Sequence, residues 1–123
     1  MREILIADDD AGLRQSLRLA LEAAGYRVRV AAHGGEAFDL QSDKPADVLI
    51  TDIFMPESDG FEAIDRFRKE FPATKIVAMS GDAKRAKREY LPVAKLIGVD
   101  ATLKKPFRLQ DLLQTLKTLG ASA

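Results

Sequence analysis

Polar side chains that could do phosphoryl chemistry follow four short apolar runs of this chain. The runs are residues 4–7, 48–51, 76–79 and 101–103, and the residues that follow them are, in order, Asp8 with Asp9, Asp52, Ser80, and Lys104 with Lys105. If the runs are parallel strands of one sheet, their carboxyl ends share the edge at which such sheets bind ligands. Carboxylates, a hydroxyl and an amine would then meet in one crevice. This combination indicates a metal-dependent phosphoryl site.

Carboxylates placed this close together favour a bound cation. Like charges repel and raise one another's pKa, whereas Mg²⁺ is bound by carboxylate, carbonyl, water and phosphoryl oxygens. Asp8, Asp9 and Asp52 could supply the ligands from the protein. A lysine at the neighbouring strand end adds a compact positive charge for phosphoryl oxygens, and the Ser80 hydroxyl can donate to the same group. Asp52, which stands alone at its strand end, is the expected nucleophile.

Length and composition predict one domain over residues 1–123. The chain has 123 residues, 46% of them hydrophobic, which suffices for one sizeable core. Lys plus Arg equals Asp plus Glu at 19 each, so no charge excess would draw the chain to nucleic acid or an anionic membrane. Cysteine is absent, which excludes disulfides and thiolate catalysis. The apolar stretch after Met1 is too short for a signal peptide or a membrane span, so we expect a cytoplasmic protein.

Short β-type runs alternate with stretches of helical period, which predicts repeated βα units and a parallel sheet. A first helix is expected at 11–24, with Asp10 as its N-cap and Gly25 after its end. Residues 26–30 alternate apolar and basic side chains, as an edge strand does. A strand is expected at 47–51 and a loop at 55–60. Four more helices are expected: one opens at 34–35, one carries Phe61, Ile64 and Phe67 on one face, one lies at about 90–98, and the last begins at Leu109.

Four motifs at these strand ends resemble, in order, those of two-component response regulator receiver domains of the single-domain, chemotaxis-receiver type. They are Asp8 with Asp9, residues 52–56, Ser80 with Gly81, and Lys105 with Pro106 and Phe107. The resemblance covers nearly the whole chain. It implies an α/β, flavodoxin-like, doubly wound five-stranded parallel sheet of order 2-1-3-4-5 with helices on both faces. It also implies that Asp52 accepts a phosphoryl group from a phosphohistidine of a sensor histidine kinase or histidine phosphotransfer protein.

The same resemblance assigns roles residue by residue. Asp9 and Asp52 would bind Mg²⁺ directly, Asp8 would act through water, and the backbone carbonyl of Phe54 would complete the ligands from the protein. Lys105 would pair with the phosphoryl group, and its bond to the following proline is commonly cis in the family. Adjacent strand residues point to opposite faces, so Lys104 cannot share this task.

Signalling in the family runs through a hydroxyl that Ser80 would supply. Its movement toward the phosphoryl group shifts an existing equilibrium and changes the face built from the fourth helix, fifth strand and fifth helix, here about 90–119. Thr102 stands where many receivers carry an aromatic switch residue, so ring rotation cannot be the readout. The Phe54 side chain could obstruct hydrolysing water and lengthen the life of the phosphoform.

The expected function is therefore a signalling phosphoacceptor, not an enzyme, with at most weak self-phosphorylation and self-dephosphorylation. Two alternatives remain: an aspartyl-phosphate phosphatase, since Asp8 and Asp10 form an Asp-x-Asp pattern, and a receiver-like interaction module that is never phosphorylated. His33 is expected as a surface histidine, and the basic residues 84–88 as a solvated loop or a docking site. The cognate kinase, the downstream protein target, the oligomeric state, and whether the chain stands alone or belongs to a longer protein are left open.

Overall fold

Five parallel strands form the central sheet of the computed structural model, which describes residues 3–55, 58–80 and 98–121. The strands are β1 (Glu3–Ala7), β2 (Arg27–Ala31), β3 (Val48–Asp52), β6 (Lys75–Ser80) and β7 (Ala101–Lys104), in the order β2-β1-β3-β6-β7. Counted along the chain, this is the 2-1-3-4-5 order predicted from the resemblance. The doubly wound fold is therefore confirmed.

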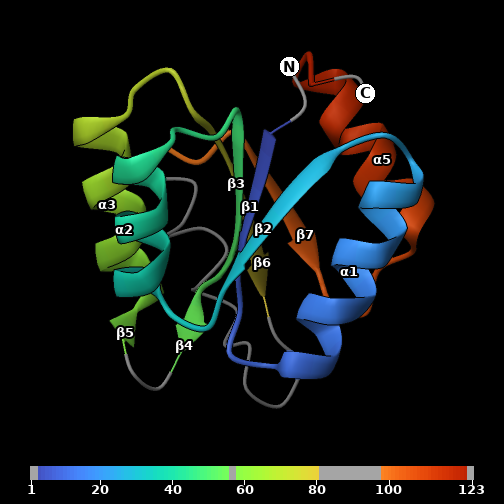
Figure 1. Ribbon diagram of the computed structural model, residues 1–123, viewed down its shortest axis with the longest axis horizontal. Coiled ribbons are helices and arrows are strands. Elements are labelled where there is room, and N and C mark those ends of the chain that lie inside the picture. The colour runs from blue at the N-terminus through green and yellow to red at the C-terminus, as the bar shows by residue number, and fades with distance from the viewer. Residues whose placement is uncertain (1–2, 56–57, 81–97, 122–123) are drawn as a thin grey trace.

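Helices cover both faces of the sheet. Helices α1 (Ala11–Ala23) and α5 (Leu109–Thr118) lie on one face, and α2 (Gly34–Asp43) and α3 (Gly60–Glu70) lie on the other (Figure 1). Each layer has its own core, and β1 serves both by alternation. Ile4 and Ile6 pack with α1 and α5, whereas Leu5 and Ala7 face α2 and α3. The central strands are consequently buried on both sides, which explains their continuous apolar runs.

The ends of α1 follow from two residues of the sequence. The Asp10 side chain caps the helix by accepting from the Leu13 backbone N–H at 3.1 Å. Gly25 follows the helix with a φ of 100°, a backbone conformation that costs glycine least. The helix ends at Ala23, one residue before the predicted end.

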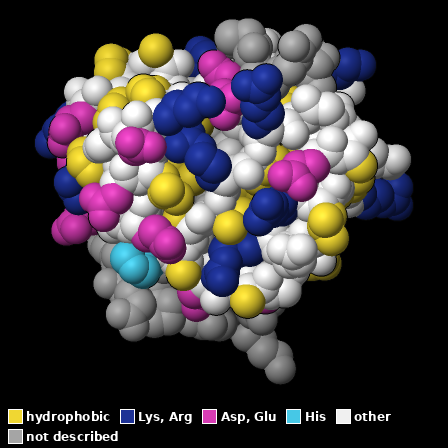
Figure 2. Space-filling view, in the orientation of Figure 1, with side chains coloured by type: hydrophobic (Ala, Val, Ile, Leu, Met, Phe, Trp, Pro, Cys, Tyr) yellow, Lys and Arg dark blue, Asp and Glu magenta, His cyan; other side chains and the backbone are white. Residues whose placement is uncertain are grey.

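Strand β2 lies at an edge of the sheet, as its alternating pattern predicts. Figure 2 views the molecule with β2 toward the reader, and basic side chains gather on this face with acidic ones among them. Arg27 and Lys44, both well exposed, pair with Glu3 at 3.3 and 3.5 Å. Charged side chains on an edge strand oppose pairing with a strand of another molecule.

Two expectations about the middle of the chain had different outcomes. The segment expected as a loop contains a short antiparallel ladder, β4 (Phe54–Met55) with β5 (Ser58–Asp59), directly before α3. Its Pro, Ser, Asp and Gly content indicates turns, and two-residue strands have no periodicity to detect. Residues 90–97 of the helix expected at 90–98, and the basic residues 84–88, lie outside the described residues. Among the helices that the structure describes, none is long and apolar enough to cross a membrane.

Candidate phosphoacceptor site

Strands β1 and β3 bring Asp8 and Asp52 side by side at the carboxyl edge of the sheet. Ala7 pairs with Thr51 in the register of these strands, so the next residue of each strand is an aspartate. Asp8 is fully buried and Asp52 is 5% exposed, whereas Asp9 is exposed. One carboxylate oxygen from each of the three aspartates lies within 4.8 Å of the other two. The predicted acidic cluster is thus assembled in space.

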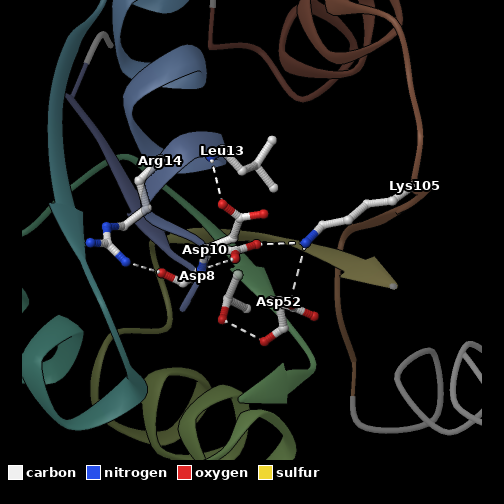
Figure 3. A network of polar contacts seen from close by, with 7 residues as sticks. Asp8, Asp10, Leu13, Arg14, Asp52 and Lys105 are labelled. Carbon is white, nitrogen blue, oxygen red and sulfur yellow. Dashed lines mark hydrogen bonds and ion pairs between the residues drawn. The ribbon is translucent and has the colours of Figure 1, made fainter. Parts of the chain in front are cut away.

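Lys105 reaches this cluster from the end of β7. Its Nζ donates to Asp8 Oδ2 at 2.7 Å and to Asp52 Oδ2 at 3.2 Å (Figure 3). The backbone N–H of Lys105 donates to the carbonyl of Ser80 at 3.0 Å, which fixes the chain beside the end of β6. Lys104 is exposed, and the Lys105-Pro106 bond is cis as expected. The structure therefore places Lys105, and not Lys104, against the acids.

The charge of Lys105 is stabilised by its surroundings. Burial lowers the pKa of the ammonium. The hydrogen bond to Asp8 and the negative charge of Asp52 together raise the pKa by more than burial lowers it, so the net pKa stands above the ordinary value for lysine. Lys105 therefore carries its positive charge at neutral pH and compensates two buried carboxylates.

Hydrogen bonds to main-chain groups help to hold the acidic turn, residues 8–10. The backbone N–H of Asp8 donates to the carbonyl of Ala31 at 3.1 Å, and that of Asp10 donates to Asp8 Oδ1 at 2.8 Å. Arg14 Nη1 donates to the carbonyl of Asp8 at 2.8 Å. Sequence reasoning missed Arg14. The sequence shows only an arginine in the first turns of the predicted helix, four residues after the N-cap Asp10, and its half-buried position is known from the structure alone.

Ser80 ends β6 at the same edge of the sheet. Ser80 is 1% exposed, and within the described ranges its hydroxyl has no hydrogen-bond partner. A buried hydroxyl without a partner is costly and uncommon in native proteins. The hydroxyl is therefore available to a group that enters the site.

The other predicted residues occupy varied positions. Thr102 is half-buried on β7 and pairs with Ala78 of β6, so strand β6 separates it from β3, the strand that carries Asp52. Phe54 begins β4 two residues after Asp52, so its backbone lies near the site. Asp10 is a helix cap, as expected. His33, expected as a surface histidine, is half-buried and caps α2 by accepting from the Glu36 N–H at 3.2 Å.

The residues at the site fit Mg²⁺. All three clustered side chains offer carboxylate oxygens, the hard ligands that Mg²⁺ prefers, and two of them are close enough to share one ammonium group. The third, Asp9, is exposed, so an ion can reach the cluster from solvent.

This geometry agrees with what comparison with known proteins shows. The family model of the response regulator receiver domain matches residues 4–117. The chain therefore belongs to the response regulator receiver family of two-component systems.

Individual relatives cover the chain to different extents. Response regulator receiver protein CpdR of Brucella abortus is 36% identical over 123 residues, which is all of both chains. Response regulator MprA of Mycobacterium sp. (strain KMS) is 36% identical over 94% of this chain, and the chain spans 49% of MprA. A CheY-like receiver domain protein of Methanospirillum hungatei JF-1 superposes with a TM-score of 0.89 at 30% identity, covering 97% of this chain and 93% of that one. Chemotaxis protein CheY4 of Vibrio cholerae gives 0.86 at 32% identity, covering 96% and 98%.

Proposed function

We propose that Asp52 accepts a phosphoryl group from a phosphohistidine on a sensor histidine kinase or a histidine phosphotransfer protein. The single observation that carries the proposal is the convergence of Asp8, Asp9, Asp52 and Lys105 at one edge of the sheet. In this step a carboxylate oxygen of Asp52 attacks phosphorus. A P–O bond forms, the P–N bond breaks, and the imidazole leaves with its electron pair. The product is an acyl phosphate on Asp52.

Lys105 and the acidic residues have different electrostatic roles in this step: Lys105 binds the phosphoryl group and the acidic residues bind the metal ion. The Lys105 ammonium turns from the carboxylates to the phosphoryl oxygens, where it compensates the charge of the transferred group. Asp9, Asp52 and the carbonyl of Phe54 would hold Mg²⁺, with Asp8 acting through water. When bound, Mg²⁺ supplies the positive charge that lets an anionic donor approach anionic side chains.

Ser80 is the proposed switch residue. Its buried hydroxyl has no hydrogen-bond partner within the described ranges, so a phosphoryl oxygen on Asp52 would give it an acceptor. Movement of Ser80 would also move the chain at Lys105, because the Ser80 carbonyl accepts a hydrogen bond from the Lys105 N–H. We infer that the surface around the fourth helix, β7 and α5 then changes and is read by a downstream protein. Thr102 contributes no ring movement to this readout.

A phosphatase reading of the Asp-x-Asp pattern has less support. Asp8 accepts hydrogen bonds on both carboxylate oxygens, from Asp10 N–H and from Lys105 Nζ. Asp10 is engaged in capping α1. We therefore propose a cytoplasmic signalling phosphoacceptor with weak self-phosphorylation and self-dephosphorylation at most.

The test is phosphorylation by acetyl phosphate and Mg²⁺, followed by intact mass and peptide mapping. We expect addition of one phosphoryl group at Asp52, its loss in Asp52→Asn, and its loss when Mg²⁺ is chelated. Asp10→Asn is the matched control, because asparagine also caps helices well and the variant removes one carboxylate from the same turn. Addition that persists in Asp52→Asn, or that maps to Asp8, would overturn the proposal.

A further inference from the structure

We infer that Arg14 is a positioning residue that holds the acidic turn in the geometry a divalent cation needs. The inference rests on the proposed function, because it concerns the same cation. It adds a residue from α1 to a site otherwise built from strand ends. The contact that carries it is the hydrogen bond from Arg14 Nη1 to the carbonyl oxygen of Asp8, at 2.8 Å.

The acidic turn needs support beyond the sheet. The register of β1 with both of its neighbours ends at Ala7, so residues 8–10 lie past the last paired position. Three successive carboxylates repel one another there. Asp8 is fully buried while Asp9 is exposed, so the turn must keep one carboxylate inside the protein and direct the next toward solvent.

Arg14 restrains the part of the turn that Lys105 does not. Figure 3 shows the two basic side chains approaching Asp8 from opposite sides. Lys105 binds the carboxylate of Asp8, whereas Arg14 binds its backbone carbonyl. A guanidinium is planar and permanently charged, so it gives a strong and directional hydrogen bond.

The restrained carbonyl belongs to the peptide bond between Asp8 and Asp9. That peptide unit is planar, so its orientation fixes the position of the Asp9 Cα, the atom from which the Asp9 side chain leaves the backbone. Arg14 therefore acts on the exposed carboxylate through the main chain, without contacting the ion. Residues that support metal ligands in this way change metal affinity by about 10- to 100-fold when they are replaced.

The test compares Arg14→Gln and Arg14→Lys with wild type, using Mg²⁺ alone as the probe in isothermal titration calorimetry. Arg18→Gln is the matched control: it removes the same charge from the same helix, at an exposed arginine paired with Glu22 at 3.3 Å. Gln and Lys are both good helix formers, so the variants should fold, and circular dichroism checks this. Amide exchange of the Asp10 N–H in the metal-free protein reports directly on the turn, because this group donates to Asp8.

We expect Arg14→Gln to weaken Mg²⁺ binding about tenfold and to speed exchange at Asp10. Arg14→Lys, which keeps the charge and one donor, should lie between Arg14→Gln and wild type, and Arg18→Gln should match wild type. A charge effect alone would instead tighten Mg²⁺ binding in Arg14→Gln. That result, unchanged binding, or equal weakening in Arg18→Gln would overturn the inference and leave the proposed function standing. Absence of saturable binding in the wild type would overturn both.

Discussion

The ammonium group of Lys105 and the carboxylate of Asp8 lie 2.7 Å apart, although the two residues are 97 positions apart in the sequence. Asp8 is fully buried and only 19% of the Lys105 side chain is exposed, so solvent screens this pair weakly. The same ammonium contacts Asp52 at 3.2 Å. The Lys105 ammonium therefore compensates the charges of two buried carboxylates, and the stability of the folded protein should depend on the charge of Lys105.

Lys105→Met should lower the free energy of unfolding by about 3 kcal/mol at neutral pH in chelator, because two buried carboxylates lose their counter-charge. The pKa of Lys105 is raised in the folded state, so its contribution is complete below the ordinary lysine pKa of about 10.4. The contribution is lost as pH rises through the folded-state pKa. Urea denaturation at a series of pH values should therefore show the two proteins converging at alkaline pH.

Lys104→Met is the control for this experiment, since Lys104 is the exposed neighbour at the end of β7. It should leave stability near that of wild type at every pH. A difference between wild type and Lys105→Met that stays constant to high pH would contradict a role for the Lys105 charge.

Asp9→Asn should stabilise the metal-free protein by roughly 1 kcal/mol and abolish the stabilisation that Mg²⁺ gives. Removing one of three clustered carboxylates relieves repulsion, and the gain is modest because Asp9 is exposed. Thermal unfolding with chelator and with Mg²⁺ measures both effects. Asp10→Asn should keep the stabilisation by Mg²⁺, because Asp10 is not one of the three clustered carboxylates, so a loss of the Mg²⁺ effect in that variant would argue against Asp10 as a cap alone.

Ser80→Ala should leave the free energy of unfolding of the unphosphorylated protein unchanged or raise it by up to about 1 kcal/mol. The hydroxyl is buried and, in the described part of the chain, makes no hydrogen bond. Thr51→Val gives the contrast, since the Thr51 hydroxyl is buried and donates to the carbonyl of Asp52 at 3.0 Å. That variant should lose about 1 kcal/mol. Equal destabilisation of the two in urea denaturation would show that Ser80 has a structural partner.

The sheet could be predicted from sequence because its signals are local. Short apolar runs that end on polar residues mark buried parallel strands, and the alternation in residues 26–30 marks the edge. Alternation also indicated that only one of Lys104 and Lys105 could face the acids, because successive strand residues point to opposite faces. The choice of Lys105 came from the resemblance, since Lys105 directly precedes Pro106, and Lys105 is the one found against the acids.

Other features depend on how far side chains reach in the folded protein. Arg14 contacts a carbonyl six residues before it, and nothing in helical periodicity predicts this contact. His33 caps α2, although Ser, Thr, Asp and Asn are the usual caps, so its type gave no signal. The ladder of β4 and β5 is too short for a pattern to form.

Strand β1 separates two hydrophobic layers while contributing to both. Ile6 belongs to the layer of α1 and α5, and Leu5, its neighbour in sequence, belongs to the layer of α2 and α3. Truncations placed in opposite layers share no cavity, so their energetic penalties should be nearly independent, whereas two truncations within one layer should be coupled. A change in packing in one layer can therefore affect the other layer only through a shift of the backbone of β1 and its neighbouring strands.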